Sequence, residues 1–234
     1  MKTLRPITIL LFLNLMAAPF CIAQDWPGLG HFSEENKKLN PPVPDEDRVV
    51  FMGNSITIGW LHARPQFFEG KPYINRGISG QTTPQMLVRF RQDVLDLRPK
   101  VVVILAGTND IAGNTGPSTL EMIVDNIKSM AQLAAANNIK VIISSVLPVF
   151  DYPWKPGLKP NEKIPALNKL LKEYADANGF LYLDYFSAMA DGRNGLPKKY
   201  AEDGVHPTAA GYAIMEPLVE AAITKLIRPN TVNK

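Results

Sequence analysis

The sequence predicts an α/β fold in which a mainly parallel five-stranded sheet lies between two helix layers, a doubly wound three-layer α/β/α sandwich. Five short apolar runs alternate with segments of helical periodicity, and this alternation is typical of a parallel sheet that helices cover on both faces. The right-handed crossover rule makes double winding the natural assembly. The 234 residues suffice for one well-buried domain and are few for two.

Five strands are expected. The run 101–106 is continuously apolar and rich in β-branched residues, which is typical of a strand covered on both faces. Shorter runs of the same kind occur at 49–52, 73–75, 141–143 and 180–183.

Helices are expected between and after these strands, at 120–134, 167–178 and about 208–227. Apolar residues recur there at i, i+3, i+4 and i+7. Ser118 with Glu121 predicts a capping box at the start of the first of these helices. Pro217 is predicted to kink the last helix or to break its hydrogen bonding.

Residues 1–23 have the pattern of an export signal. A basic start precedes an apolar stretch at 7–16, and Ala23 ends a run suited to cleavage before Gln24. The apolar stretch is too short to span a bilayer as a mature helix, so we expect export to the periplasm or medium without stable membrane insertion. The alternatives are a retained N-terminal anchor and a lipid on Cys21.

Residues 24–47 are expected to form a proline-rich lead-in, and 48–234 the folded domain. The formal net charge of the chain is +3, and two of the positive charges lie in the predicted signal. A nearly neutral chain without a basic run is not expected to bind nucleic acid or acidic membranes. Cys21 is the single cysteine, so a disulfide, a thiol nucleophile or a thiolate metal site is not expected after processing. No metal and no cofactor are expected.

Ser55 is a candidate nucleophile because it directly follows the first predicted strand, within Gly53-Asn54-Ser55-Ile56-Thr57. A serine at a strand-to-helix turn lies near N–H groups that favour developing negative charge. Alone, such a serine is more often a helix cap. Thr57 also occupies the position where the nucleophile elbow G-x-S-x-G has glycine.

His206 is the candidate base that Ser55 would need. It lies in Asp203-Gly204-Val205-His206-Pro207, just before the last predicted helix. A serine hydroxyl becomes a good nucleophile when a base takes its proton, and a carboxylate can hold the imidazole in the required tautomer. Asp203, three residues earlier, could supply that carboxylate. The alternative is a capping aspartate followed by a structural histidine.

Two further polar clusters follow predicted strands, at 77–81 and 107–110. The backbone N–H groups of Ser55 and Gly80, together with the side chain of Asn109, would provide three donors to an oxyanion. Separately, each cluster could be an ordinary turn or loop. In a doubly wound sheet, however, ligands bind at the carboxyl ends of the strands. Each cluster either follows a predicted strand directly or, at 203–207, immediately precedes the last predicted helix, so all of them can converge on one edge of the sheet.

In these residues the chain resembles the SGNH (GDSL-type) hydrolase family of esterases and lipases, and within it the platelet-activating-factor-acetylhydrolase-like branch. The resemblance covers residues 53–207 and implies the flavodoxin-like form of the three-layer fold. It also implies a serine esterase with Ser55 as nucleophile, Asp203 and His206 as the base pair, and Ser55, Gly80 and Asn109 as the oxyanion hole.

The chain departs from the family pattern at one place, where G-D-S-L becomes Gly53-Asn54-Ser55-Ile56. Asn54 can still hydrogen-bond nearby backbone, but it removes a negative charge beside the site. The expected substrates are small esters with short acyl groups, acetyl first, with acetylated carbohydrate as the leading candidate. The alternatives are a lysophospholipase or thioesterase of the same fold and a non-catalytic carbohydrate-binding module. A nucleotide-binding protein is disfavoured because the chain has no phosphate loop.

The segment 148–160 contains four prolines and three aromatic residues and is expected to be a stiff loop beside the site. Tyr152 or Trp154 could form a wall of the acyl pocket or stack on a sugar ring. The other interpretation, which we favour for the pair, is that they pack down and anchor the loop.

Overall fold

The protein is described by a computed structural model, which covers residues 24–228, so the predicted export signal at 1–23 lies outside the described residues. Five parallel strands form one sheet in the order β2-β1-β3-β4-β5. The strands are β1 Val49–Gly53, β2 Tyr73–Gly77, β3 Val101–Leu105, β4 Lys140–Ser144 and β5 Leu181–Leu183. The predicted five-stranded, doubly wound parallel sheet is therefore confirmed.

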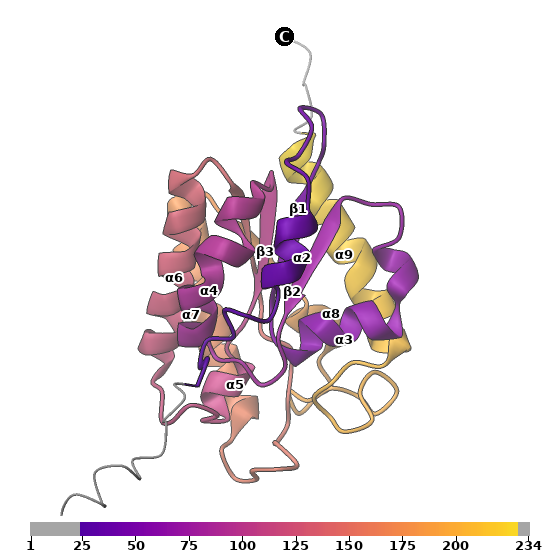
Figure 1. The fold of residues 1–234 in the computed structure, drawn as a ribbon. Coiled ribbons are helices and arrows are strands. Elements are labelled where there is room, and N and C mark those ends of the chain that lie inside the picture. Colours follow the sequence, from indigo (N-terminus) through magenta and orange to yellow (C-terminus); the bar gives the residue numbers. More distant parts are fainter. Residues whose placement is uncertain (1–23, 229–234) are drawn as a thin grey trace, which may run out of the picture.

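The helices lie on both sides of this sheet (Figure 1). They are α2 Ser33–Lys38, α3 Ser55–Ala63, α4 Thr83–Asp93, α5 Thr108–Ile111, α6 Leu120–Ala136, α7 Pro160–Asn178, α8 Phe186–Met189 and α9 Ala209–Ile227, with short 3₁₀ turns at Pro65–Phe67 and Leu95–Leu97. Helices α4, α6 and α7 cover one face, and α3 and α9 cover the other. The predicted three layers are thus present.

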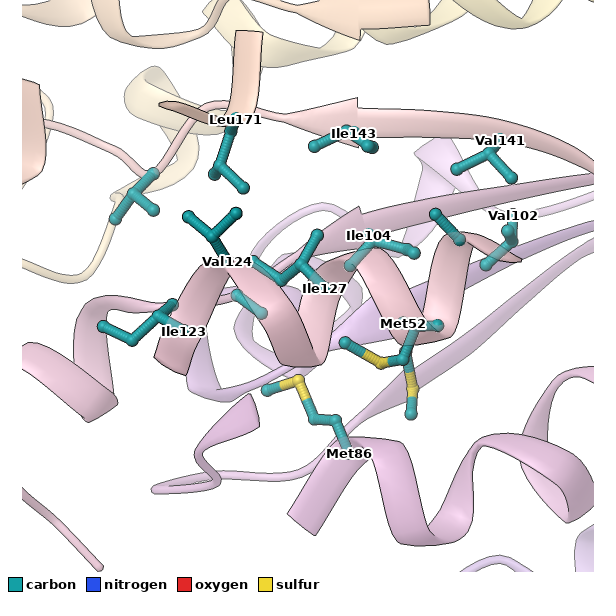
Figure 2. Close-up of a cluster of buried hydrophobic side chains, with 14 of the residues drawn as sticks. Met52, Met86, Val102, Ile104, Ile123, Val124, Ile127, Val141, Ile143 and Leu171 are labelled. Atoms are coloured by element: carbon teal, nitrogen blue, oxygen red, sulfur yellow. The ribbon is translucent and has the colours of Figure 1, made fainter. Parts of the chain in front are cut away.

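One buried apolar cluster lies on each face of the sheet, between the sheet and the helices that cover it. There are two clusters because successive residues of a strand point to opposite faces of the sheet. Val50 and Met52 of β1 pack toward α4, α6 and α7, whereas Val49 and Phe51 pack toward α3 and α9. Figure 2 shows the first cluster, in which side chains of α6 such as Ile127 lie against those of the sheet. Both faces are buried, which explains why the strands read as continuous apolar runs.

One helix detail differs from the expectations. The N-cap of α6 is Thr119, whose hydroxyl accepts from the Met122 N–H, so the predicted capping box at Ser118 is wrong by one residue. Helix α9 runs from Ala209 to Ile227 with Pro217 inside it, and the proline, which has no N–H, cannot make the helical hydrogen bond at its position, as expected. Tertiary packing outweighs the lost hydrogen bond, because α9 buries Met215 and Val219 on either side of the proline.

The strand order creates a topological switch point beside β1. From β1 the chain passes to β2 on one side of it and then to β3 on the other. A crevice forms outside the carboxyl ends of strands at such a reversal, and it is where ligands bind in open α/β sheets. Ser55 begins α3 directly after β1, and Asn109 lies in α5 after β3. The fold therefore brings these two residues to the border of the crevice.

Candidate active site

The turn that carries Ser55 is held by its neighbours on both sides. Asn54 is the N-cap of α3, and its side-chain oxygen accepts from the Ile56 N–H at 3.0 Å. Asparagine thus performs the capping that an aspartate would perform. Helix α3 also approaches the end of β2 closely, since a Cβ at Gly77 would lie 2.3 Å from the Ile58 nitrogen. This contact requires glycine and fixes the start of α3 against the sheet.

Ser55, His206 and Asp203 form a continuous chain of hydrogen bonds, although 151 residues separate the first two. The Ser55 Oγ lies 2.9 Å from His206 Nε2, and His206 Nδ1 lies 2.6 Å from Asp203 Oδ2. A carboxylate can only accept, so Nδ1 carries the ring proton and Nε2 is left with the lone pair that faces the hydroxyl. The structure therefore brings together the three residues that the sequence predicted to meet.

Asp203 is arranged to stay ionised. Partial burial opposes its charge, but the hydrogen bond from the His206 ring and those from the backbone of His206 and Val205 outweigh it, and the net effect lowers the pKa of Asp203. The two N–H groups both donate to Oδ1 at 2.8 Å. An ionised Asp203 stabilises the imidazolium that forms when His206 accepts a proton.

Three N–H groups are available at the rim for a developing negative charge. Within residues 24–228, the backbone N–H groups of Ser55 and Gly80 donate to no protein acceptor. The buried Asn109 donates one Nδ2 hydrogen to the Gln81 carbonyl at 2.9 Å, which leaves its second hydrogen free for a ligand. The Gly80 loop is tied to the end of β1, because Ile78 N–H donates to the Gly53 carbonyl at 3.2 Å.

The structure shows two residues of this region to which the sequence pattern assigned no role, Gln81 and Arg89. Arg89 lies fully buried on α4 and donates to the Gln81 side chain and to the Gly53 carbonyl, as well as forming an ion pair with Asp93 at 2.9 Å. It therefore bonds both the turn before Ser55 and the loop that carries Gly80. An arginine inside a helix gives no sequence signal of this role, whereas the position of Gln81 directly after Gly80 could have drawn attention to it.

Asp110, next to Asn109, holds the start of α4 by hydrogen bonds. Its carboxylate accepts from the Thr83 N–H and hydroxyl at the start of α4. Burial raises the pKa of Asp110, and the bonds from Thr83 act in the opposite direction. Among residues 24–228 there is no group of three or more His, Cys, Asp or Glu side chains placed to hold a metal ion. In the same part of the chain, no helix has the length and apolar character needed to cross a membrane.

Tyr152 and Trp154, the two residues of the 148–160 loop that were candidates for substrate binding, have different positions. Tyr152 is fully buried, and its hydroxyl donates to the Thr108 carbonyl at 2.8 Å. It cannot contact a substrate, so the predicted substrate-binding role of Tyr152 is wrong and the anchoring interpretation holds. Trp154 is 49% exposed, and its ring lies 6.1 Å from that of His206 at an angle of 31°. Only Trp154 therefore borders the site.

A comparison with protein families matches residues 51–214 to the GDSL-like Lipase/Acylhydrolase family. The acetylxylan esterase of Xylanibacter ruminicola is 28% identical over 221 residues, which cover 78% of this chain and 44% of the esterase. This chain thus spans less than half of that relative. The platelet-activating factor acetylhydrolase IB subunit alpha1 of Pongo abelii is 28% identical over 210 residues, which cover 87% of this chain and 83% of that subunit.

Solved structures agree with these sequence matches. The crystal structure of a GDSL-like lipase from Bacteroides thetaiotaomicron has a TM-score of 0.83 and 48% sequence identity, and the match covers 85% of this chain and 98% of the lipase. An acetylxylan esterase from Geobacillus stearothermophilus matches with a TM-score of 0.60 at 20% identity, covering 76% of this chain and 94% of that chain, which is a likeness of fold.

Proposed function

This chain belongs to the GDSL-like lipase/acylhydrolase family and is a carboxylic ester hydrolase, and we propose that it cleaves short acyl esters, acetyl esters first, with Ser55 as nucleophile. The observation that carries the proposal is the 2.9 Å contact between Ser55 Oγ and His206 Nε2, with Asp203 bonded to the other ring nitrogen. Nucleophile, base and orienting carboxylate are thereby joined in one chain of hydrogen bonds.

The proposed reaction has two halves. His206 accepts the Ser55 proton as Oγ attacks the ester carbonyl, and the N–H groups of Ser55 and Gly80 with the Asn109 amide stabilise the tetrahedral oxyanion. The C–O bond to the alcohol breaks, and the alcohol leaves with the proton from His206. Water then attacks the acyl-enzyme, gives a proton to His206 and releases the acid, and the proton returns to Ser55.

We propose an acetylated carbohydrate as the substrate class. Trp154 supports this, because its half-exposed ring lies beside His206, where the alcohol part of the ester leaves. A flat aromatic face suits the apolar face of a sugar ring, and an aromatic residue with a polar edge is well suited to a wet binding site. A relative named acetylxylan esterase also supports it. A lysophospholipid or thioester substrate is the alternative.

The test of the nucleophile compares the wild type, Ser55→Ala and the control Ser129→Ala, a half-buried serine on α6 whose hydroxyl donates to the Asp125 carbonyl of the same helix. We expect Ser55→Ala to lower kcat on p-nitrophenyl acetate by at least about 10³-fold, and Ser129→Ala to leave it unchanged. A fluorophosphonate should attach at Ser55 in the wild type. Attachment at another serine, or equal turnover by wild type and Ser55→Ala, would overturn the proposal.

The test of the substrate class compares Trp154→Ala with Phe150→Ala, another exposed aromatic residue of the same loop. Both variants are assayed on an acetylated xylo-oligosaccharide and on ethyl acetate, which has no ring. We expect Trp154→Ala to lower kcat/KM on the oligosaccharide about tenfold and to change ethyl acetate hydrolysis little, since a lost ring contact costs about 1–1.5 kcal/mol. Equal losses on both substrates would argue against a sugar site at Trp154.

We further propose that the protein is exported, on the basis of the signal pattern at 1–23. N-terminal sequencing of the protein recovered from cell fractions should find Gln24 as the first residue of the exported form. An intact Met1 start in the recovered protein would contradict this.

A further inference from the structure

The lead-in segment is bonded to the loop that carries Gly80. The side chain of Gln81, which is almost fully buried, donates through Nε2 to the Pro27 carbonyl at 2.7 Å. Two glutamines of α4 bind the same short segment, Gln85 at the Trp26 carbonyl and Gln92 at the Leu29 carbonyl. The indigo trace of this segment runs beside α4 before it enters α2 (Figure 1). The segment is therefore fastened to the domain next to the site.

Two other bonds of Gln81 connect it to residues of the site. Its side-chain Oε1 accepts from Arg89 Nε at 2.6 Å, and another nitrogen of Arg89 donates to the Gly53 carbonyl at 3.1 Å, two residues before Ser55. The main-chain carbonyl of Gln81 accepts from Asn109 Nδ2 at 2.9 Å. One residue thus contacts the lead-in, the turn before Ser55 through Arg89, and Asn109.

We propose that Gln81 is a positioning residue for the oxyanion donors and that Pro27 and Gly28 of the lead-in are part of this device. The inference rests on the proposed function, in which the Gly80 N–H and the Asn109 amide bind the oxyanion. Such donors are effective only when they are held in place before the charge develops. Supporting hydrogen bonds around a site hold such donors in place. Gln81 follows Gly80 directly in the chain, and its main-chain carbonyl accepts from Asn109.

Gly28 permits the close contact between the lead-in and the side chain of Gln81 because it has no Cβ. Its φ is +73°, and a Cβ there would lie 3.2 Å from Gln81 Nε2 and 3.3 Å from Ile78 Cδ1. Both neighbours belong to the loop that carries Gly80, and Gln81 is held by its bonds on both sides. A methyl group at Gly28 therefore presses on the loop without changing any residue of the proposed site.

The first experiment uses Gly28→Ala, with Gly70→Ala as the matched control. Gly70 has nearly the same φ of +70°, and a Cβ there meets no atom within 4 Å. Both variants carry the strain of alanine at positive φ, but only Gly28→Ala touches the loop. With active sites counted by fluorophosphonate titration, we expect kcat per site on p-nitrophenyl acetate to fall about threefold to tenfold in Gly28→Ala and to stay at the wild-type value in Gly70→Ala.

The second experiment uses Gln81→Met, which keeps the length of the side chain and removes its two side-chain bonds. Gln92→Met is the control, because it loses only the bond to the Leu29 carbonyl. We expect kcat per titrated site to fall about tenfold in Gln81→Met, with KM and the pH profile unchanged, and to stay at the wild-type value in Gln92→Met. A merely structural role would lower the thermal midpoint and the number of active sites, but not kcat per site.

The outcomes separate this inference from the proposed function. If Ser55→Ala is inactive while Gln81→Met and Gly28→Ala keep the wild-type kcat per site, the proposed function stands and the positioning role is overturned. Should Gln81→Met fail to fold, Gly28→Ala and its control decide alone. An equal loss in Gly70→Ala and Gly28→Ala also overturns the inference, and an active Ser55→Ala overturns the proposed function itself.

Discussion

The two halves of the site are held in different ways. The donor half consists of Gly80 and Asn109, and the base half of Asp203 and His206. Asn109 is 5% exposed and bonds the main chain of another loop, whereas the side chains of His206 and Asp203 are 42% and 41% exposed. The donor half is fixed by contacts between distant segments, and the base half mostly by bonds within one short turn.

This difference fits the work that each half is proposed to do. Donors to an oxyanion must not reorganise when the charge appears, so they gain from burial and from fixed partners. A base must exchange protons with the substrate, the leaving alcohol and water, so it needs access to solvent. The comparison predicts that substitutions in the base half impair proton transfer. Substitutions in the donor half are expected to raise the activation free energy of ester cleavage by the same amount at every pH.

The largest effect is expected from Asp203→Asn in the base half. An amide nitrogen at the place of Oδ2 would face His206 Nδ1, so the ring is expected to turn its proton to Nε2, where it can no longer accept from Ser55. We expect kcat to fall roughly 10³–10⁴-fold, measured on p-nitrophenyl acetate. Asp191→Asn is the matched control, because Asp191 also accepts N–H groups of its own loop. A loss below tenfold in Asp203→Asn would remove Asp203 from the mechanism.

The next effect is expected from Asn109→Ala in the donor half. Removal of one side-chain donor to the oxyanion is expected to lower kcat about 10²–10³-fold with little change in KM. The control is Asn126→Ala, an amide that bonds the Thr83 hydroxyl at the start of α4, two residues after the Gln81 carbonyl that Asn109 bonds. If both variants lose equal activity, the loss comes from the support of α4, and Asn109 is not a donor to the reaction.

The pH dependence separates the halves directly, because only the base half titrates. His206 must be neutral to accept the proton, so kcat/KM should fall about tenfold per pH unit on the acid side of the imidazole titration. Despite partial burial, the hydrogen bonds that Asp203 accepts lower its pKa, so this carboxylate stays ionised over the assay range. Asn109→Ala should keep the wild-type midpoint at a lower plateau. A flat profile between pH 5 and 8 would contradict a base role for His206.

The fold and the motif residues could be predicted because their signals are local. The β-branched run at 101–106 has the burial of a central strand and forms β3. The polar clusters at 53–57, 77–81 and 107–110 lie at the ends of strands, and the cluster at 203–207 directly precedes α9. No comparable pattern indicates α4, whose buried face includes Arg89 and Asp93 beside Met86 and Phe90. Two buried charges in a helix weaken its apolar periodicity, and only the structure shows that they pair with each other.

The support of the donor half could not be predicted, because it depends on pairings between distant segments. The bond from Gln81 to Pro27 joins residues 54 positions apart, and a glutamine after a motif glycine has many alternative partners. The sequence favours burial of Tyr152 without establishing it, since a tyrosine in a proline-rich loop can face the site or the core. In the structure Tyr152 faces the core, where its hydroxyl donates a hydrogen bond to the Thr108 carbonyl.

The smallest expected effect tests whether this tyrosine matters to the donor half. Tyr152→Phe removes the hydroxyl that donates to Thr108, the residue before Asn109, while the ring still fills its place. Burial raises the pKa of Tyr152, so the hydroxyl stays protonated and the bond exists throughout the assay range. We expect a loss of about 1 kcal/mol in the free energy of unfolding, measured by urea denaturation, and a kcat within about threefold of wild type.

Tyr174→Phe is the matched control, because the Tyr174 hydroxyl is buried without a hydrogen-bond partner among the described residues. Its removal should leave stability unchanged or raise it slightly, since no bond is lost and a polar group is no longer buried. If Tyr152→Phe instead lowered kcat as strongly as Asn109→Ala, the placement of Asn109 would depend on the 148–160 loop. The donor half would then extend from the lead-in on one side to this loop on the other.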